Sequence, residues 1–187
     1  MSEIETIRDQ VISCTKCDLC KTRTNAVPGK GNPRAEIMFV GEAPGRTEDQ
    51  RGEPFVGAAG KKLTGVLEKN GLARDAVYIT NVVKCRPPNN RVPTEKERTM
   101  CNDYLEGEIR FVNPKIICIM GNTACNSILG QGEITKNRGK IIQRDGRTFF
   151  LTFHPAAIIY NQELETILDK DIAKLVSELE KIKNEKP

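Results

Sequence analysis

The sequence has little of what would place the protein in a membrane or outside the cell. Its 187 residues include no tryptophan, one histidine and only 5% aromatic residues. No apolar run approaches the roughly 18 to 20 residues that a membrane span requires, which argues against a membrane protein. The first residues, MSEIETIRDQ, are charged and lack the apolar core of a signal peptide. We therefore expect a cytoplasmic protein that does not bind a membrane.

The length and net charge say less about the domain organisation and the partners of the protein. A chain of 187 residues is long enough for one domain with a sizeable core. Because no repeat or low-complexity linker divides it, we expect a single domain over residues 1–187. The net charge of +4 permits a polyanionic partner such as nucleic acid, but a solvated surface explains it as well. Basic clusters at 84–86 and 136–140 could contact phosphates.

Short apolar runs alternate with helical patterns along the chain. Helices are predicted at 4–12, 56–70 and 121–129, from Thr94 to about Phe111 after a capping box with Glu97, and along 164–182. Four apolar runs predict strands at 36–41, 77–81, 115–120 and 148–153, and a glycine- and proline-rich loop is expected at 27–33. This alternation predicts an α/β fold with a mostly parallel four-stranded sheet and helices on both sides.

Distinctive residues follow three of the four predicted strands. The segment Gly41–Gly45 follows the first strand, Asn81 closes the second, and His154-Pro155 follows the fourth. In a parallel sheet, ligands bind where the carboxyl ends of the strands open into loops. We therefore expect these three motifs to converge on one edge of the sheet.

Seven cysteines are many for a reducing compartment, where metal binding or catalysis is a better explanation than disulfides. Cys14 and Cys17 form a C-x-x-C pair, which suits a metal centre, zinc included, or a redox disulfide. Cys20 adds a third sulfur at the same spacing. Cys85 follows a strand, and Cys101 lies about two turns into a helix, so the two could face the same point.

Four thiolates suit either a four-iron cluster or a tetrahedral zinc ion. The sequence lacks the second C-x-x-C pair of a zinc ribbon, which slightly favours iron. Cys118 lies in an apolar strand and Cys125 beside small residues in a short helix, so we expect both to be buried core residues.

Several motifs in order along the chain resemble the iron–sulfur uracil-DNA glycosylases, known as family 4 of the uracil-DNA glycosylase superfamily. The resemblance extends over most of the chain, and the order and spacing of the motifs make it specific. The matching segments are Cys14-x-x-Cys17-x-Leu19, Arg23, Val27-Pro28-Gly29-x-Gly31, Gly41–Gly45, Glu48-Asp49, Gly52-x-Pro54-Phe55-Val56-Gly57, Thr80–Pro88 and His154–Ala157.

The resemblance implies a three-layer α/β/α sandwich and an enzyme of DNA repair. Such an enzyme flips uracil, which arises from deaminated cytosine, out of single- or double-stranded DNA and hydrolyses its N-glycosidic bond. The resemblance also implies a [4Fe–4S] cluster held by Cys14, Cys17, Cys85 and Cys101, with Cys20 outside the ligand pattern. Because base excision has no redox step, we expect the cluster to be structural. A monomer is expected, and a sliding clamp is a further candidate partner.

The resemblance assigns uracil recognition to three side chains that also have suitable chemistry. Phe55 offers an aromatic face on which the flipped base could stack. Asn81 offers an acceptor and a donor that complement the N3–H and O4 of uracil, provided that its neighbours hold the amide in place. His154 could donate a hydrogen bond to O2 as negative charge develops on the leaving base.

Other residues have less definite roles. Gly41, Glu42 and Ala43 are expected to line the pocket, and Glu42 is a candidate for orienting the attacking water, with Glu48 and Asp49 as alternatives. Some relatives in the wider superfamily carry aspartate at the position of Ala43, which leaves the water-orienting residue open. We assign Glu48 instead to exclusion of the thymine methyl group.

The segment after His154-Pro155 is small and then bulky and apolar. Ile158 or Ile159 is the predicted wedge that fills the gap left by the flipped base, although a hydrophobic contact at a helix entry would explain the same residues. Three rival functions remain open at this point. They are a glycosylase with a broader range of bases, a non-catalytic iron–sulfur or zinc module that binds nucleic acid, and a redox protein that uses Cys14 and Cys17 as a dithiol.

Overall fold

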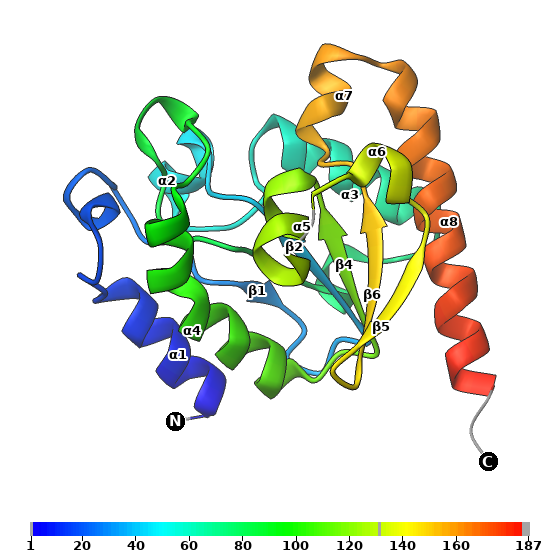
Figure 1. Ribbon diagram of the computed structural model, residues 1–187, viewed down its shortest axis with the longest axis horizontal. Coiled ribbons are helices and arrows are strands. Elements are labelled where there is room, and N and C mark those ends of the chain that lie inside the picture. Colours follow the sequence, from blue (N-terminus) through cyan, green and yellow to red (C-terminus); the bar gives the residue numbers. More distant parts are fainter. Residues whose placement is uncertain (1, 131, 185–187) are drawn as a thin grey trace.

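A six-stranded sheet forms the centre of the protein in the computed structural model, which describes residues 2–130 and 132–184 (Figure 1). The strand order is β1-β3-β2-β4-β6-β5. The inner strands run parallel to one another, which confirms the predicted α/β class and the mostly parallel sheet. These inner strands are β3 (Tyr78–Asn81), β2 (Ile37–Gly41), β4 (Ile116–Met120) and β6 (Arg147–Thr152).

The prediction of four strands missed the two edge strands, which are antiparallel to their neighbours. The first, β1 (Lys30–Gly31), has two residues and lies inside the stretch predicted as a loop. The second, β5 (Ile141–Arg144), forms a hairpin with β6. Asp145 and Gly146 connect them with φ angles of 51° and 73°, as a tight hairpin turn requires. The Asp-Gly pair was therefore a usable hairpin signal.

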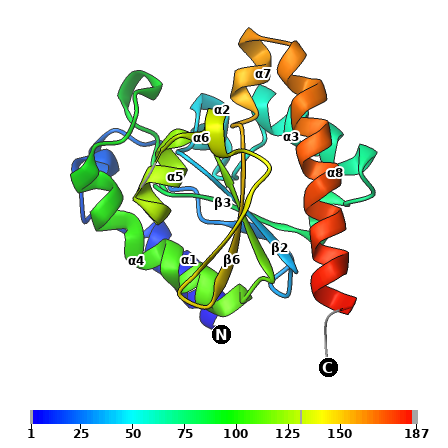
Figure 2. The same ribbon diagram turned by 45° about the vertical axis from the view of Figure 1, so that its right-hand side comes forward.

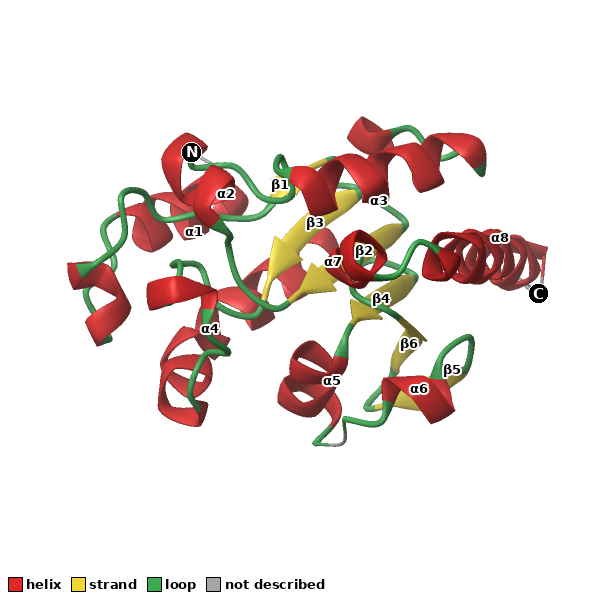
Figure 3. Ribbon diagram, turned by 90° about the horizontal axis from the view of Figure 1, so that it is seen from above, coloured by secondary structure: helices red, strands yellow, loops and turns green. Residues whose placement is uncertain are grey.

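Helices cover both faces of the sheet, so the predicted three-layer arrangement is present (Figures 2 and 3). Met38 and Val40 of β2 point to one core, while Ile37 and Phe39 point to the other. The first core is covered by α1 (Glu3–Ile12), α4 (Glu95–Val112) and α5 (Asn122–Leu129). The second is covered by α3 (Ala58–Lys69), α7 (Ala156–Tyr160) and α8 (Glu163–Asn184). Two short helices, α2 (Arg46–Arg51) and α6 (Ile134–Asn137), complete the α-helices, and 3-10 turns lie at Asp18–Lys21, Arg74–Ala76 and Pro88–Asn90.

Local signals explain where two of the helices begin. The side chain of Thr94 accepts a hydrogen bond from Glu97 N, and Glu97 returns one to Thr94 N, so the predicted capping box opens α4. Helix α3 begins later than predicted, at Ala58. Its N-cap is Gly57, which is extended with a ψ of −163°, so Val56 and Gly57 lie outside the helix.

Two predictions about the rest of the chain can be compared with the structure. Cys118 and Cys125 are buried in the core, as expected. None of the helices in the described part of the chain combines the length and apolar content needed to cross a membrane. Residues 1, 131 and 185–187 of the predicted single domain lie outside the described residues.

The carboxyl ends of the inner strands lie together at the top of the molecule in Figure 1. Gly41 at the end of β2 is paired with Asn81 at the end of β3, and β6 ends at Thr152, two residues before His154. The parallel register therefore places the three predicted motifs at the same edge of the sheet.

Candidate active site

A cavity of about 400 Å³ opens at this edge of the sheet, within the size range of small-molecule sites. Its wall is built from the loops that follow β2, β3 and β6 and from the start of α3. The lining residues are Glu42 to Glu48, Phe55, Gly57 to Ala59, Asn81, Pro87, Asn90, Arg91, His154, Ala156, Ile159 and Tyr160. The predicted residues Glu42, Ala43, Phe55, Asn81 and His154 are among them, and their chemical roles stay predictions. Gly41 was also expected to line the pocket but does not, because the side chains of Phe55 and Asn81 lie against it.

Phe55, Asn81 and His154 meet around the end of β2. The ring centroids of Phe55 and His154 are 5.5 Å apart, with the two planes tilted by 34°. A methyl group at Gly41 would come within 2.5 Å of Phe55 Cζ and 2.6 Å of Asn81 Oδ1. Glycine is therefore required at this position, because any side chain there would displace both neighbours.

Two buried polar side-chain atoms in the described residues have no hydrogen-bond partner, and both belong to this cavity. They are Oδ1 of Asn81 and Nε2 of His154. Buried polar atoms without partners cost about 1–3 kcal/mol each, so folded proteins rarely keep them without a reason. The pair marks a place where a ligand with one donor and one acceptor would be bound.

Hydrogen bonding defines the protonation of His154. The main-chain N–H of Ala156 donates to His154 Nδ1 at 3.2 Å, so Nδ1 carries no proton. Burial lowers the pKa of the imidazole to about 4, and the nearby charge of Glu48 opposes this shift without reversing it. At neutral pH the ring is therefore uncharged, with its only proton on Nε2. A hydrogen-bond donor thus points into the cavity, a state that the sequence alone did not define.

Glu48 holds the loop that carries Phe55. Its Oε1 accepts hydrogen bonds from the main-chain N–H groups of Val56 at 2.9 Å and Gly57 at 2.7 Å. These bonds support the left-handed conformation of Phe55, which is uncommon for a bulky residue. Glu48 also lines the cavity, so exclusion of a methyl group stays a prediction beside this positioning role.

The candidates for the water-orienting carboxylate differ in their position relative to the cavity. Glu42 is half-buried in the cavity wall. Asp49 is buried away from the cavity, where its Oδ1 accepts hydrogen bonds from the main-chain N–H groups of Thr24 and Asn25. Asp49 is therefore withdrawn as a candidate, because its carboxylate holds a loop and does not reach the cavity.

The two wedge candidates differ in how far they are buried. Ile158 is 1% exposed and packs in the core beneath α7, so the prediction for this residue is wrong, because a core side chain cannot enter a DNA stack. Ile159 is 49% exposed and lines the cavity. Tyr160, which the sequence did not single out, is 90% exposed beside it.

One residue of the first basic cluster requires correction. Lys84 is 1% exposed, so it cannot contact a phosphate. In the second cluster, Arg138 pairs with the buried Asp171 at 2.7 Å. Lys136 and Lys140 are exposed, so phosphate contact by this cluster stays a prediction. The cavity itself has two exposed cations, Arg46 and Arg91, which no sequence pattern indicated.

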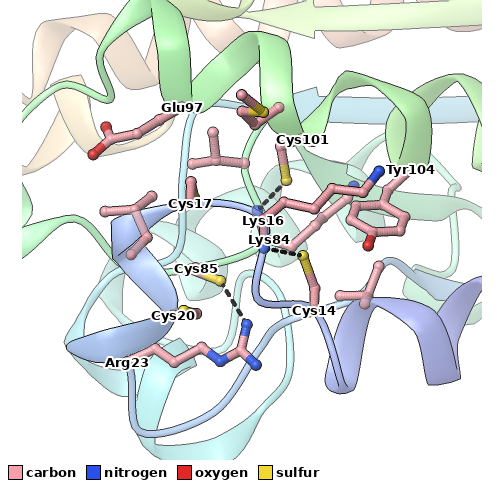
Figure 4. A pocket seen from close by; sticks show the side chains of 14 residues that line it. Cys14, Lys16, Cys17, Cys20, Arg23, Lys84, Cys85, Glu97, Cys101 and Tyr104 are labelled. Carbon is pink, nitrogen blue, oxygen red and sulfur yellow. Dashed lines mark hydrogen bonds between the residues drawn. The ribbon is translucent and has the colours of Figure 1, made fainter.

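A second, smaller cavity brings together five cysteines from three parts of the chain (Figure 4). Cys14 and Cys17 lie between α1 and the 3-10 turn that holds Cys20, Cys85 follows β3, and Cys101 is on α4. The structure thus gathers all four predicted ligands and also Cys20. Among the described residues, no three cysteine, histidine or acidic side chains are placed to hold a single metal ion.

Nitrogen donors surround the sulfur atoms of this cavity, as the dashed lines of Figure 4 show. Arg23 donates to Cys85 Sγ at 3.1 Å, Lys84 N to Cys101 Sγ at 3.3 Å, and Lys16 N to Cys14 Sγ at 3.5 Å. Such bonds stabilise the negative charge of thiolate ligands.

Burial acts against ionisation of the same thiols. It raises the pKa of Cys101 to about 11 and raises the pKa values of Cys17 and Cys85 above their usual range. Thiols in this setting become thiolates when bound metal supplies the compensating positive charge. The donor set and its neighbours therefore fit a thiolate-ligated group larger than a single metal ion.

The two cavities are connected by one ion pair. Arg91 lines the first cavity and Glu97 lines the second, and the guanidinium donates to both carboxylate oxygens at 2.7 and 2.8 Å. This bidentate pair lowers the pKa of Glu97 to about 2. The contact between Arg91 and Glu97 therefore joins the cysteine cavity directly to the loop that borders the first cavity.

Comparisons with known proteins agree with this geometry. Residues 28–180 match the uracil DNA glycosylase superfamily. A type-4 uracil-DNA glycosylase of Sulfurisphaera tokodaii is 52% identical, with 94% of this chain and 84% of that protein covered. Type-4 uracil-DNA glycosylases of Archaeoglobus fulgidus (46% identical, 94% of this chain and 92% of that protein) and Thermotoga maritima (44% identical, 95% of each chain) also match. The chain belongs to the uracil DNA glycosylase superfamily and, within it, to the type-4 uracil-DNA glycosylases.

Proposed function

We propose that this protein is a DNA-repair enzyme that flips uracil out of DNA and hydrolyses its N-glycosidic bond. The observation that carries the proposal is the pair of unpartnered buried atoms, Asn81 Oδ1 and His154 Nε2, in one cavity with the ring of Phe55. Uracil offers an N3–H for the first atom, an O2 for the second and a flat face for the ring.

Recognition follows from the hydrogen-bonding pattern of the base edge. Uracil presents a donor at N3 and an acceptor at O4, whereas cytosine presents an acceptor at N3 and a donor at its exocyclic amine. The amide of Asn81 complements uracil when Oδ1 faces N3–H and Nδ2 faces O4. A base inside a duplex cannot reach this edge, so the nucleotide leaves the stack first.

Catalysis depends on stabilising the departing base. Negative charge develops on O2 of uracil as the N-glycosidic bond lengthens, and the Nε2–H of His154 supplies a donor in a dry setting. The neutral imidazole keeps its proton throughout, so it stabilises charge without acting as an acid. Glu42 is the carboxylate that we assign to the attacking water, because it lies in the cavity wall.

Contacts with DNA outside the base are assigned to exposed residues around the cavity. Ile159 fills the gap left by the flipped nucleotide, since it is half exposed on α7 beside His154. Arg46 is exposed at the cavity and is our candidate for contact with a flanking phosphate, because the guanidinium of Arg91 is already paired with Glu97.

Cys14, Cys17, Cys85 and Cys101 would hold a [4Fe–4S] cluster. When bound, the group supplies iron–sulfur bonds that cross-link three separate segments of the chain. Hydrolysis of an N-glycosidic bond transfers no electron, so the role we assign is structural. The contacts of Arg23 and Lys84 N with Cys85 and Cys101 orient these ligands.

The decisive experiment is release of uracil from a defined oligonucleotide by purified protein, with the visible absorption spectrum recorded on the same sample. Single- and double-stranded substrates with one uracil are compared with hypoxanthine, xanthine and mismatched thymine. We expect uracil release together with the broad absorption of an iron–sulfur protein. DNA binding without base release, in the wild type and in His154→Ala alike, would favour the non-catalytic module. Size-exclusion chromatography with and without a sliding clamp tests the predicted monomer and that partner.

A further inference from the structure

A buried ion pair lies directly behind the pocket residue Asn81. Lys84 Nζ and Glu108 Oε2 are 2.6 Å apart, and the two side chains are 2% and 1% exposed. Burying two charges costs several kcal/mol per ion, which is offset only where the geometry is good and the remaining hydrogen bonds are satisfied. Such a pair is weak evidence for stability, so its retention calls for another explanation.

Every proton of the Lys84 ammonium group has an acceptor. Besides Glu108, Nζ donates to Thr80 Oγ1 at 2.5 Å and to the main-chain carbonyl of Asn81 at 2.8 Å. The carboxylate of Glu108 is equally occupied, since it accepts from Thr80 Oγ1 at 2.7 Å and from Gly29 N at 2.8 Å. The ammonium and carboxylate groups of this network are therefore both held by hydrogen bonds, and the network includes the main-chain carbonyl of Asn81.

Lys84 also contacts the cysteine cavity through its main chain. Its N–H donates to Cys101 Sγ at 3.3 Å, and the next residue is Cys85 (Figure 4). One residue therefore touches both sites, through its ammonium group on one side and its backbone on the other.

The amide of Asn81 depends on a fixed main chain because Oδ1 has no hydrogen-bond partner. Oδ1 is buried and lies so close to the main chain of Gly41 that a methyl group added there would come within 2.6 Å of it, so contacts with neighbouring atoms hold the amide in place of hydrogen bonds to Oδ1. Packing prevents rotation of the amide only while its backbone stays in place. A rotated amide presents a donor where uracil needs an acceptor, and it then suits cytosine.

We propose that Lys84, held by Glu108, is a positioning residue that fixes the uracil-reading amide of Asn81 and links its position to the cysteine cavity. This inference rests on the proposed function, because it needs a pyrimidine in the pocket. It assigns to a buried lysine a role in selectivity that does not involve contact with DNA.

The test is a double variant, Lys84→Met with Glu108→Gln, which removes both charges together and leaves the N–H of residue 84 in place. Steady-state initial rates are measured over a range of oligonucleotide concentrations, with one uracil or one target cytosine in each oligonucleotide. We expect kcat for uracil to fall by about ten- to a hundredfold, as a small misplacement of a reading group does, with little change in KM. We also expect the uracil-to-cytosine rate ratio to fall, while the visible absorption per protein stays at the wild-type value.

Val112→Ala is the matched control, because Val112 is a buried residue of the same helix as Glu108. It lowers stability through lost packing, and we expect kcat and the rate ratio to stay at the wild-type values. If the double variant fails to fold, Thr80→Val replaces it. Thr80→Val removes one hydroxyl from the network without leaving a charge unpaired, and we expect a smaller change in the same direction.

The outcomes separate this inference from the proposed function. Absence of uracil release by the wild type overturns the proposed function itself. Release by the wild type, together with unchanged kcat and rate ratio in a folded network variant, overturns the role of Lys84 alone. A loss of the rate ratio equal to that of Val112→Ala also overturns it, because general destabilisation then explains the effect.

Discussion

The pH dependence of uracil release tests the assigned state of His154 most directly. Burial lowers the pKa of this imidazole to about 4, and the proton of the neutral ring is on Nε2 because Nδ1 accepts from Ala156 N. Because the neutral ring is the active form, kcat/KM should fall only as pH approaches the pKa of the free enzyme. With a pKa of about 4, about 90% of the ring is still neutral at pH 5.

An unperturbed histidine would behave differently over the same range. With a pKa of about 6.5, only about 3% of the ring is neutral at pH 5, so the rate would fall about thirtyfold between pH 8 and pH 5. The assay is the initial rate of release at low concentrations of a single-stranded oligonucleotide, which gives kcat/KM and avoids effects of duplex stability. We expect kcat/KM to be nearly constant from pH 8 to pH 5. A break near pH 6.5 would refute the assignment, and a rate that rises as pH falls would show that the charged ring is active.

Substitution of His154 measures how much its Nε2–H group contributes to the rate of uracil release. His154→Phe keeps a ring against Phe55 and removes the donor, so we expect the rate to fall by about 10²–10³-fold, or about 2.7–4 kcal/mol. Because the lost contact forms mainly in the transition state, kcat should fall while substrate binding changes little. A loss under threefold would mean that the buried Nε2–H does not face the developing charge.

Three further outcomes follow from the same geometry. Asn81→Asp replaces the amide donor by a carboxylate oxygen, which repels uracil O4 and accepts from the cytosine amine, so cytosine release should rise relative to uracil release. Glu48→Ala should release thymine faster than the wild type does, and it should also weaken uracil release because the Phe55 loop loses its support. Cys85→Ser should lose the visible absorption of the cluster, whereas Cys20→Ser should keep it.

Each of these outcomes has a control and a contrary result. Base release from uracil and cytosine oligonucleotides gives the ratio for Asn81→Asp, and an unchanged ratio would remove Asn81 as the reader. Thymine release by a folded Glu48→Ala protein that is no faster than that of the wild type counts against methyl exclusion, and Glu48→Gln separates charge from support. Loss of absorption in Cys20→Ser would show that the ligand set has been assigned wrongly.

Local sequence patterns accounted for most of the architecture. The four apolar runs predicted the inner strands with each boundary within one residue, because a buried parallel strand is a continuous apolar segment. Thr94 and Glu97 predicted the start of α4 through a capping box that acts within four residues. The edge strands were missed because β1 has only two residues and because the Asp145-Gly146 turn signal was not used.

For the site, the sequence by itself determined which side chains lie at the edge of the sheet. This is because the last residues of neighbouring parallel strands lie at the same edge. That is why Asn81 and His154 could be placed together from residues far apart in the chain. Only the tertiary structure decided which groups are buried. Ile158 faces the core and Ile159 the solvent, Lys84 lies in a closed network, and two polar atoms are left without partners in one cavity. The physical reason is that burial depends on which distant elements pack over a side chain, and neighbouring residues in the sequence do not encode that.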